Sequence, residues 1–439
     1  MAISLLSVTQ ISALSTTVIQ NLTVTEIATL SASQVGAINT SGIAVIDATQ
    51  LAALSTTQVR GLTGTQISGF QSNLVFSTNQ LLVLNSQQFG SLTSSQLDSF
   101  DETHIAVISA TQLAALSTTN FSSLDATQIG ALNSTQIAGI TATEIRNLTT
   151  TDVSEFRATQ LGALSVTQLR SFTPTNLSAL DATQVAGLST TQVAALTTTQ
   201  VAGLTGTDVG EFTSTQLGAL SGTQLGTLSA TSFSALNETT VAALSTTQLR
   251  GVTVTQVGGL TTTDVGEFTA TQVGSLSASQ LGALSTANIA ALSTTQVGGL
   301  TATQLASLSA TKLSALDATQ VGSLNTTQIG ALTTTQLRAL STTDFAEITA
   351  TQVGTLSASQ LGALSASNLS ALDATTAAAL TTTQLAGITT TQIAGLSAAD
   401  ANEFTATQLG ALSTTQLRAF TATNLSALDA TQVAGLSTT

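Results

Sequence analysis

The sequence predicts an all-α solenoid of very short capped helices, one for each unit of an eight-residue repeat. Three features predict this fold. A large apolar residue recurs at every eighth position, as at Leu188, Leu196, Leu204 and Phe212. A helix-capping residue opens nearly every unit, and two mostly small residues precede the large apolar one. A single octad buries too little apolar surface to be stable alone, so neighbouring units must stack on one another.

The repeat keeps one register over most of the chain. With the large apolar residue as position 8, the consensus is Ser or Thr at 1, Thr at 3, Gln at 4, Val, Ile or Leu at 5, and small residues at 6 and 7. Eight octads cover 7–70, a six-residue unit covers 71–76, and 45 octads cover 77–436. The register predicts one continuous solenoid over 1–439 with a slip at 71–76. Because the sequence ends inside an octad without a polar cap, we expect another surface to cover that end.

A longer period overlies the octad from about residue 93. Octads ending in Phe156, Phe212 and Phe268 share the pattern Thr-Asp-Val-x-Glu-Phe and lie 56 residues, or seven octads, apart. The next acidic octad ends in Ile348, 80 residues after Phe268, so the period is interrupted there. Two interpretations stay open at this point. Blocks of seven octads were duplicated in the gene, or seven octads match a superhelical turn or a repeat of lateral contacts.

Positions 1 and 4 of the octad have the chemistry of a helix N-terminus. Position 1 is Ser, Thr, Asp or Asn in 52 of the 53 octads, and Arg157 is the exception. Such side chains accept a hydrogen bond from an unpaired N–H of the first turn. Gln at position 4 completes a capping box, and the apolar residues at positions 8 and 5 form the flanking hydrophobic staple. The only proline, Pro174, falls at position 2, the first helical residue, where its missing N–H does no harm.

Small and aromatic residues are also fixed to particular positions. Positions 6 and 7 hold 28 of the 32 glycines. Glycine inside a helix costs up to about 1 kcal/mol relative to alanine, so we expect a close approach between neighbouring backbones to compensate. All thirteen phenylalanines lie at position 5 or 8, or end the short unit at Phe76. Positions 5 and 8 are three residues apart and therefore share one helix face, which should point inward.

A β-solenoid is the alternative fold, with Thr-Thr-Gln-Val as a strand and the glycine-rich step as a corner. Thr and Val favour strands. Asp and Asn at position 1, together with frequent Ala-Ala-Leu and Gly-Ala-Leu steps, favour short helices instead. One uninterrupted helix is excluded, because eight residues at 100° each overshoot two turns by about 80° and the apolar stripe would spiral around the helix.

The composition excludes several classes of function. Charged residues make up 7% of the chain, the formal net charge is −14, and there is no Cys, Trp or Tyr. An acidic chain of this kind offers no basic surface to nucleic acid. No apolar run is long enough to span a membrane. The N-terminal MAISLLSVTQISAL lacks a basic region and a long apolar core, so it is not a Sec-type signal peptide. We expect an extracellular or cell-surface location that is reached by another route.

No catalytic constellation is present in the sequence. His104 is the only histidine, and it occupies position 4 as a substituted capping residue. A lone histidine cannot build a histidine-based triad or a multi-histidine metal site. The chain also lacks a thiol, a phosphate-binding glycine loop, a serine-hydrolase elbow and an aromatic stacking platform. We therefore expect no enzymatic activity, no catalytic residue and no cofactor.

Paired carboxylates are the only candidate ligands for a metal ion. Asp at position 4 and Glu at position 7 are three residues apart and share one helix face. Stacked coils give such pairs a possible Ca²⁺ site, although there is no EF-hand loop, and solvated or salt-bridged surface is the alternative. The pairs are Asp152/Glu155, Asp208/Glu211, Asp264/Glu267, Asp344/Glu347 and Asp400/Glu403. Six of the seven arginines share position 6 and are candidate partners across coils or between molecules: Arg60, Arg146, Arg170, Arg250, Arg338 and Arg418.

Runs such as LSTTQVAAL, LTTTQVAGL and LSASQLGAL resemble the octapeptide arrays of long, repetitive bacterial secreted or surface-associated proteins, often described as adhesin-like. The resemblance covers essentially the whole chain. The calcium-binding or enzymatic modules of larger relatives have no counterpart here, so the resemblance implies no activity. With the uncovered end, it favours an extracellular structural protein that assembles with itself into a fibre, filament or surface coat. The alternative is a binding module whose Ser/Thr face contacts a cell surface, a glycan or ice.

Overall fold

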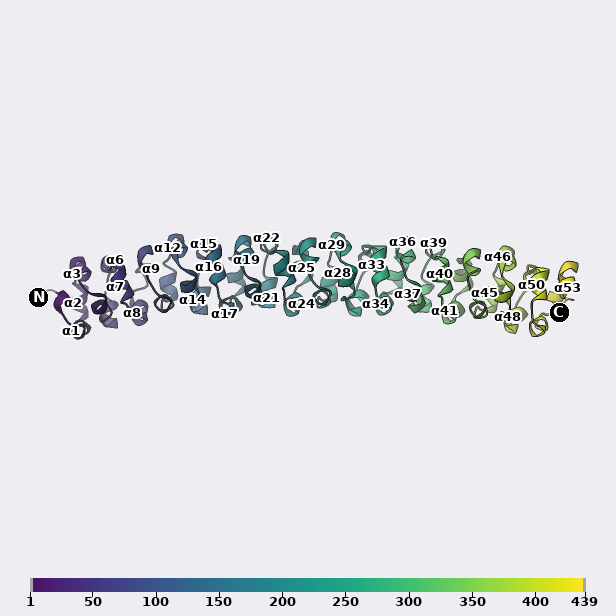
Figure 1. Ribbon diagram of the computed structural model, residues 1–439, viewed down its shortest axis with the longest axis horizontal. Coiled ribbons are helices and arrows are strands. Elements are labelled where there is room, and N and C mark those ends of the chain that lie inside the picture. The colour runs from purple at the N-terminus through teal and green to yellow at the C-terminus, as the bar shows by residue number, and fades with distance from the viewer. Residues whose placement is uncertain (1–2, 437–439) are drawn as a thin grey trace. The chain divides into compact units, whose positions relative to one another are not determined.

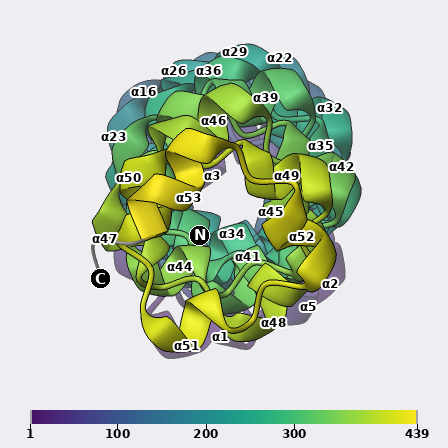
Figure 2. The same ribbon diagram turned by 90° about the vertical axis from the view of Figure 1, so that its right-hand side faces the viewer.

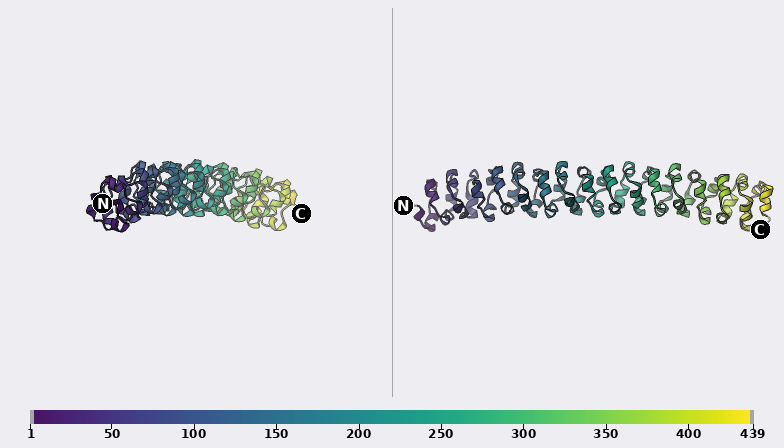
Figure 3. Two further views of the ribbon diagram at one scale, coloured as in Figure 1. Left: turned by 60° about the vertical axis from the view of Figure 1, so that its left-hand side comes forward. Right: turned by 45° about the horizontal axis from the view of Figure 1, so that its top comes forward.

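A computed structural model describes residues 3–436 and confirms the all-α solenoid (Figure 1). These residues form one short 3-10 helix and 53 α-helices, and they contain no strand. The β-solenoid alternative is therefore wrong. Spatial contacts divide the chain into two compact units, Met1–Leu220 and Ser221–Thr439. Within each unit the helices follow one another around a coil, as further views also show (Figure 3).

The unit Met1–Leu220 contains the following helices: η1 (Ile3–Leu5), α1 (Val8–Ser12), α2 (Thr16–Gln20), α3 (Val24–Ala28), α4 (Ala32–Val35), α5 (Thr40–Ile43), α6 (Ala48–Ala53), α7 (Thr56–Arg60), α8 (Gly64–Gly69), α9 (Thr78–Leu81), α10 (Ser86–Phe89), α11 (Ser94–Leu97), α12 (Glu102–Val107), α13 (Ala110–Leu113), α14 (Thr118–Ser122), α15 (Ala126–Ala131), α16 (Ser134–Gly139), α17 (Ala142–Arg146), α18 (Thr150–Ser154), α19 (Ala158–Ala163), α20 (Val166–Leu169), α21 (Pro174–Ser178), α22 (Ala182–Ala186), α23 (Thr190–Ala194), α24 (Thr198–Ala202), α25 (Gly206–Glu211) and α26 (Ser214–Leu217).

The unit Ser221–Thr439 contains the following helices: α27 (Gly222–Leu225), α28 (Ala230–Ser234), α29 (Glu238–Ala243), α30 (Thr246–Leu249), α31 (Val254–Gly258), α32 (Thr262–Gly266), α33 (Ala270–Ser275), α34 (Ala278–Ala283), α35 (Thr286–Ala290), α36 (Thr294–Gly298), α37 (Ala302–Ser307), α38 (Ala310–Leu313), α39 (Ala318–Gly322), α40 (Thr326–Gly330), α41 (Thr334–Ala339), α42 (Thr342–Ala346), α43 (Ala350–Val353), α44 (Ala358–Leu361), α45 (Ala366–Ser370), α46 (Ala374–Ala379), α47 (Thr382–Leu385), α48 (Thr390–Ala394), α49 (Ala398–Asn402), α50 (Ala406–Gly410), α51 (Thr414–Leu417), α52 (Ala422–Ser426) and α53 (Ala430–Leu436).

Every α-helix begins at position 2 of its octad, directly after the capping residue. In α23 the capping residue Ser189 has an extended backbone, and its Oγ accepts a hydrogen bond from the Gln192 N–H at 3.3 Å. Gln192 Oε1 in turn accepts from the Ser189 N–H at 2.8 Å, which completes the predicted capping box. Pro174 is the first residue of α21, as predicted. At Arg157, the exception at position 1, only the bond from its N–H to Gln160 Oε1 remains, at 2.9 Å.

The helices pack with a regular offset along the chain. Most helices contact the helix three places later, as α13 contacts α16 and α31 contacts α34, whereas across the short unit α7 contacts α9 and α8 contacts α10. Hydrogen bonds connect helices four places apart. Because a helix has neighbours on the next turn both three and four places away, one turn of the coil holds between three and four octads. In Figure 2, α35, α42 and α49 lie on the right and α34, α41 and α48 lie below the centre, so seven helices make about two turns. The seven-octad period of the sequence therefore matches two turns of the coil.

The interior of each unit is filled by side chains from positions 5 and 8. Val193 and Leu196 are both buried, and nearly all their equivalents along the chain are buried too. Phe76, Phe89 and Phe121 are among the largest fully buried side chains. The inward direction predicted for positions 5 and 8 is therefore confirmed. Burial of aliphatic and aromatic side chains inside the coil supplies the main stabilising term of each unit.

Glycines at positions 6 and 7 allow close contact between successive turns. A Cβ on Gly187 would lie 2.3 Å from the carbonyl oxygen of Ala158, and one on Gly162 would lie 2.7 Å from the carbonyl oxygen of Gly187. No described residue has a positive φ, so these glycines serve close approach rather than an unusual backbone conformation. The expected approach is confirmed at these sites. It is not general, because a Cβ on Gly210 or Gly266 would meet nothing within 4 Å.

The six-residue unit at 71–76 forms a turn in place of a helix. Leu74 and Phe76 remain buried, and the Phe76 ring packs edge-on against Phe70 with 5.5 Å between ring centroids. Side-chain bonds that pass over this unit join residues 26 apart, as from Gln88 to Leu62. The equivalent bonds elsewhere join residues 28 apart. The short unit therefore takes the place of one octad in the coil. Its two missing residues shorten the sequence separation of these bonds, but the same contact between turns is kept.

Candidate functional site

The most frequent polar contact in the structure is made by the glutamines at position 4. Gln136 Oε1 accepts a hydrogen bond from the Asn133 N–H at 2.8 Å, which caps α16. Its Nε2 donates to the carbonyl oxygens of Ile105 at 2.7 Å and Ile108 at 2.8 Å, at the end of α12. The last carbonyls of a helix have no partner within it. One buried glutamine therefore caps the start of its own helix and covers the end of the helix four octads earlier. We call this repeated contact the glutamine ladder.

The second half of this contact was not predicted from the sequence. The available signal was the excess of Gln over Glu at position 4. Either residue can accept the N–H of the capping residue in a capping box, but only the amide has N–H groups to donate. A strong preference for the amide therefore indicates an acceptor beyond the octad. The identity of that acceptor depends on the winding of the coil.

Other residues partly replace glutamine in the ladder. Asn176 is shorter, and its Nδ2 donates to the carbonyl oxygen of Leu148 alone, at 2.8 Å. Where Gly42 occupies position 4, Asn39 Nδ2 at position 1 donates to the carbonyl oxygens of Ser12 at 2.9 Å and Leu14 at 3.2 Å. Hydrogen bonds between turns are thus also made by asparagine amides, at position 4 or at position 1.

Glu144 occupies a ladder position without an amide. Its Oε2 accepts a hydrogen bond from the Thr141 N–H at 2.6 Å. Its Oε1 is buried and has no hydrogen-bond partner. Burial raises the pKa of the Glu144 carboxyl above its ordinary value. This carboxylate therefore destabilises the turn at neutral pH, because it brings an uncompensated charge into the ladder.

His104 lies at the start of α12, beside its own capping residue. Its Nδ1 is 2.6 Å from Asp101 Oδ1, and its ring stacks on Phe100 with 5.6 Å between ring centroids. A hydrogen bond from the Thr103 hydroxyl to Asp101 holds the pKa of that carboxyl well below its usual range, and the His104 N–H acts in the same direction. The histidine thus lies within a helix-capping group.

The aspartates of the acidic pairs are already engaged by hydrogen bonds. Asp152 Oδ2 accepts from the Thr149 N–H at 2.7 Å and from Ser122 Oγ, four octads earlier, at 2.5 Å. The same inter-turn bond recurs in other acidic octads. It joins Ser178 to Asp208, Ser234 to Asp264 and Ser370 to Asp400. These aspartates therefore act as acceptors within the coil, where glutamines act as donors.

The glutamates of the acidic pairs lie in clusters of carboxylates. Burial is the largest cause of the raised pKa of Glu155, and the negative charges of the nearby Asp152 and Asp125 raise it further. The Oε2 atoms of Glu155, Glu211 and Glu267 are buried without a hydrogen-bond partner. All five glutamates of the acidic pairs have a raised pKa, and burial is the largest cause for each: Glu155, Glu211, Glu267, Glu347 and Glu403. Among residues 3–436, no group of three or more His, Cys, Asp or Glu side chains is arranged to hold a metal ion.

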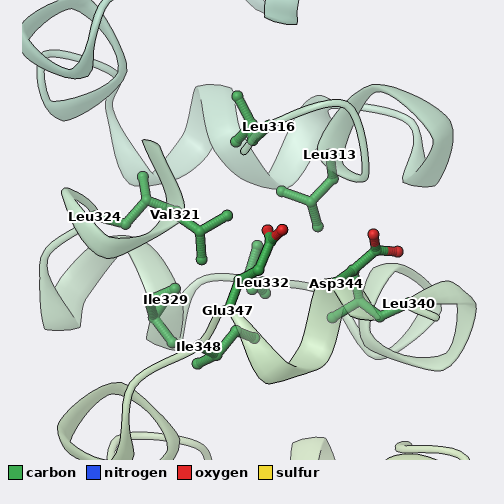
Figure 4. Close-up of a pocket in the computed structure, with 10 residues that line it drawn as sticks. All are labelled: Leu313, Leu316, Val321, Leu324, Ile329, Leu332, Leu340, Asp344, Glu347 and Ile348. Atoms are coloured by element: carbon green, nitrogen blue, oxygen red, sulfur yellow. The ribbon is translucent and has the colours of Figure 1, made fainter. Parts of the chain in front are cut away.

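Two enclosed cavities, one beside Glu347 and one beside Phe404, are small. The cavity in Figure 4 has a volume of about 20 Å³, and the Glu347 carboxylate points into it, towards Leu313 and Val321. Ile348 lines this cavity at position 8, where the other acidic octads carry the larger Phe. Ligand pockets typically measure about 300–1,000 Å³. A cavity of this size accommodates about one water molecule and no substrate.

The arginines have no carboxylate partner within the described part of the chain. The one ion pair there joins His104 and Asp101. The arginines at position 6 are exposed, including Arg250, Arg338 and Arg418. Pairing of arginine with acidic octads across coils is therefore not seen in residues 3–436. Pairing between molecules stays a prediction.

The outer surface carries shallow depressions lined by small polar residues. One lies between α14 and the end of α17 and is lined by Thr118, Thr119, Ser122, Ser123 and Asn147.

In the part of the chain that the structure describes, no helix is both long enough and apolar enough to cross a membrane.

Comparison with protein families links two stretches of the chain to a known repeat. Residues 175–206 and 273–310 match the model of the ALTTAQ repeat. A comparison with curated proteins gives no match. The first matched stretch lies in Met1–Leu220 and the second in Ser221–Thr439, so each unit contains it. The chain is a helical repeat protein with stretches similar to the ALTTAQ repeat.

Proposed function

We propose that this chain is a non-enzymatic extracellular structural protein that assembles with itself into a fibre, filament or surface coat. The observation that carries the proposal is the glutamine ladder, in which one contact between turns recurs through both units. A contact that repeats in most octads adds stability as the array lengthens, as in other solenoids. Repetition of one contact geometry in most of the 53 octads suits a protein whose task is extension rather than chemistry.

The distribution of polar groups supports the same proposal. His104 and Asp152 lie at a helix cap and in a contact between turns, and the cavity beside Glu347 is too small for a substrate. The acidic, lysine-poor and cysteine-free composition supports an extracellular or cell-surface location. We include in the proposal the absence of enzymatic activity and of a cofactor.

Electron microscopy tests the proposal directly. The full chain is purified, concentrated in steps and imaged in negative stain, with sedimentation velocity on the same samples. We expect extended or sheet-like assemblies whose proportion rises with protein concentration, because self-association follows mass action. Discrete monomers at every concentration would contradict self-assembly.

A second candidate function rests on the hydroxyl-lined depressions of the surface. Thr118 and Thr119 line one of them and make no side-chain contact needed for the α14 cap, which is formed by Ser117. Such a surface suits contact with a glycan, a cell surface or ice. Glycan-array binding and thermal hysteresis test it, with Thr118→Val and Thr119→Val as variants that keep shape and remove hydroxyls. Binding by the natural chain that the variants lose would support this function, whereas no binding in either assay would contradict it.

A further inference from the structure

Asparagine in the motif Asn-x-Ser/Thr is the acceptor residue of N-linked glycosylation. The motif recurs along the chain, and its asparagines occupy three positions of the octad. Position 4 holds Asn120, Asn176, Asn368 and Asn424, position 1 holds Asn39, Asn133, Asn237 and Asn325, and position 7 holds Asn21 and Asn147. Because the coil treats each position differently, the fold separates motifs that suit a glycan from motifs that do not.

The asparagines at position 4 are held inside the coil. Asn176, Asn368 and Asn424 are all buried. The Nδ2 atom of Asn176, which would carry the sugar, donates to the carbonyl oxygen of Leu148 at 2.8 Å. Asn368 and Asn424 make equivalent bonds to the octad four places earlier. A glycan on these nitrogens would break a contact between turns and would need space that packed side chains fill. These motifs are therefore incompatible with the folded coil.

At position 1 the asparagine side chain caps a helix. Asn133 Oδ1 accepts hydrogen bonds from the N–H groups of Thr135 and Gln136, at 3.0 and 3.1 Å. The Oδ1 atoms of Asn237 and Asn325 cap α29 and α40 in the same way. The hydroxyl residue of each of these motifs lies within the first turn of the helix. The amide is thus held against the helix start.

Asn147 is placed differently, because it follows the last residue of α17 and is exposed. Its Nδ2 donates within its own octad, to the carbonyl oxygen of Thr143 at 2.8 Å. A side-chain amide has two N–H donors and glycosylation replaces one, so the other is enough for this bond. Thr149, the hydroxyl residue of the motif, is also exposed, directly before α18. A glycan on Asn147 therefore points to solvent without breaking a contact between turns.

A shallow depression beside Asn147 gives the first sugar a place to lie. It is formed between α14 and α17, which pack against each other along the coil (Figure 1), and its volume is about 360 Å³. Asn147 lines it together with Thr118, Thr119, Ser122 and Ser123. Ligand pockets typically measure about 300–1,000 Å³, so the depression has room for a sugar. Hydroxyl groups both donate and accept hydrogen bonds, and they match the hydroxyl groups of a sugar.

We propose that Asn147 carries an N-linked glycan whose innermost sugar lies in the depression between α14 and α17. This site rests on the extracellular location proposed above, since such motifs are modified in secreted proteins. Nδ2 bonds to the anomeric carbon of a sugar supplied as a glycosyl diphosphate. The bond from that carbon to the phosphate oxygen breaks, the diphosphate leaves with the electron pair, and Nδ2 loses one proton. Asn21 is exposed too, but among the described residues no α-helix lies three places before α2 to form a depression beside it.

Peptide mapping tests the attachment. The full chain is directed through the secretory pathway of a host that attaches N-linked glycans, and the folded fraction is purified. It is then unfolded and treated with a glycan-releasing amidase in heavy-oxygen water, which converts each glycosylated asparagine to labelled aspartate. Trypsin next releases residues 147–157, because Arg146 and Arg157 bound them. We expect about tenfold more label at Asn147 than at Asn176, because a glycan on Asn176 breaks a buried hydrogen bond.

Two variants control for the motif itself. Asn147→Gln keeps an amide at the end of α17 but removes the acceptor, so the label in residues 147–157 should be lost. Thr149→Ser should keep the label, because serine retains the hydroxyl of the motif and the cap of α18. Circular dichroism verifies that both variants are folded.

Hydrogen exchange tests where the sugar lies. The glycosylated chain should exchange more slowly at α14 than the Asn147→Gln variant from the same host, because a sugar in the depression covers that helix. The variant Thr118→Val/Thr119→Val should keep the glycan but lose the slower exchange. Its helix start is preserved, because Ser117 forms the cap of α14.

The outcomes separate this site from the proposed self-assembly. A folded, secreted chain without label at Asn147, or with equal label at Asn147 and Asn176, overturns the site. Label at Asn147 with unchanged exchange at α14 overturns the place of the sugar in the depression. Label at Asn147 in a chain that stays monomeric at every concentration supports the site and contradicts self-assembly. Assemblies formed by a chain that lacks the label do the reverse.

Discussion

Gln136 Nε2 donates a hydrogen bond to the carbonyl oxygen of Ile108 at 2.8 Å, and so joins the start of α16 to the end of α12. The two residues are 28 positions apart in the chain but adjacent in the coil. Equivalent bonds recur through both units, for example from Gln200 to Phe172 and from Gln336 to Leu308. The glutamine donor of most octads therefore adds a hydrogen bond between turns to the stability that apolar burial supplies.

Replacing Gln136 by Glu should weaken this contact. The carboxylate still accepts the N–H of Asn133, but it places a negative charge against the carbonyl oxygens of Ile105 and Ile108. The Ile105 carbonyl oxygen keeps its bond from the Ile108 N–H, but loss of the buried donor leaves the Ile108 carbonyl oxygen without the Gln136 bond, which costs about 1–3 kcal/mol. Native-state hydrogen exchange should show faster opening of α12 and α16. Gln10→Glu is the matched control, because Gln10 is exposed and its box with Ser7 needs only an acceptor. Equal exchange rates in the two variants would show that the ladder contributes no stability.

Replacing Glu144 by Gln should stabilise the chain. Glu144 Oε1 is buried without a partner, whereas an amide at that place has an N–H to donate to the carbonyl oxygens of Leu113 and Leu116, which hold the ladder positions four octads earlier. We expect a gain of about 1 kcal/mol in the free energy of local opening around α17, measured by hydrogen exchange. Glu26→Gln is the control and should give no such gain, because Glu26 is exposed and its carboxylate already accepts from the N–H and the hydroxyl of Thr23. If hydrogen exchange at α17 is no slower in Glu144→Gln than in the natural chain, Glu144 is not an unsatisfied ladder residue.

Stability should rise when the pH falls from about 7 to about 5. The pKa values of Glu155, Glu211 and Glu267 are raised in the folded chain, as are those of Glu347 and Glu403. Folding then takes up protons, so this contribution is fully present below the unfolded pKa, near 4.5, and is lost as the pH rises through the folded values. The lowered pKa values of Asp101 and Asp373 act oppositely. Their contribution is present above about 3.8 and is lost in stronger acid.

Thermal unfolding followed by circular dichroism over this pH range measures the effect. Changing the five glutamates to Gln should flatten the rise in Tm between neutral and mildly acidic pH. Glu102→Gln serves as the control, because Glu102 is exposed and lies outside the carboxylate clusters. A Tm that falls steadily from neutral pH would rule out protonation of these glutamates as a stabilising event.

Alanine should be tolerated at some glycines and not at others. In Gly187→Ala the new Cβ would lie 2.3 Å from the carbonyl oxygen of Ala158, so successive turns must separate. Overpacking of this kind costs about 1–3 kcal/mol. In Gly210→Ala the Cβ meets nothing within 4 Å, and the helix gains up to about 1 kcal/mol from the better helix former. Urea unfolding of the two variants should therefore shift in opposite directions, and a shift in the same direction would contradict the role of Gly187 in close packing.

Much of the local structure was predictable because each octad contains its own start signal. The capping box of Ser189 and Gln192 and the place of Pro174 follow from contacts within three residues. Burial of positions 5 and 8 follows from their spacing on a short helix, as Val193 and Leu196 show. The candidate site was less predictable. Pairs such as Asp152 and Glu155 were interpreted as a candidate Ca²⁺ site or as solvated or salt-bridged surface, and neither interpretation includes the bond that Asp152 accepts from Ser122, 30 residues earlier.

The sequence by itself determined the helix of each octad, its start, its inward face and the positions of its small residues, because these depend on side chains within one unit. The tertiary structure decided how many octads make a turn, and with it the partner of every long-range donor. That number depends on how backbones such as those of Ala158 and Gly187 approach across turns. No contact within a single octad specifies it. The glutamine ladder and the serine–aspartate bonds both follow from the winding.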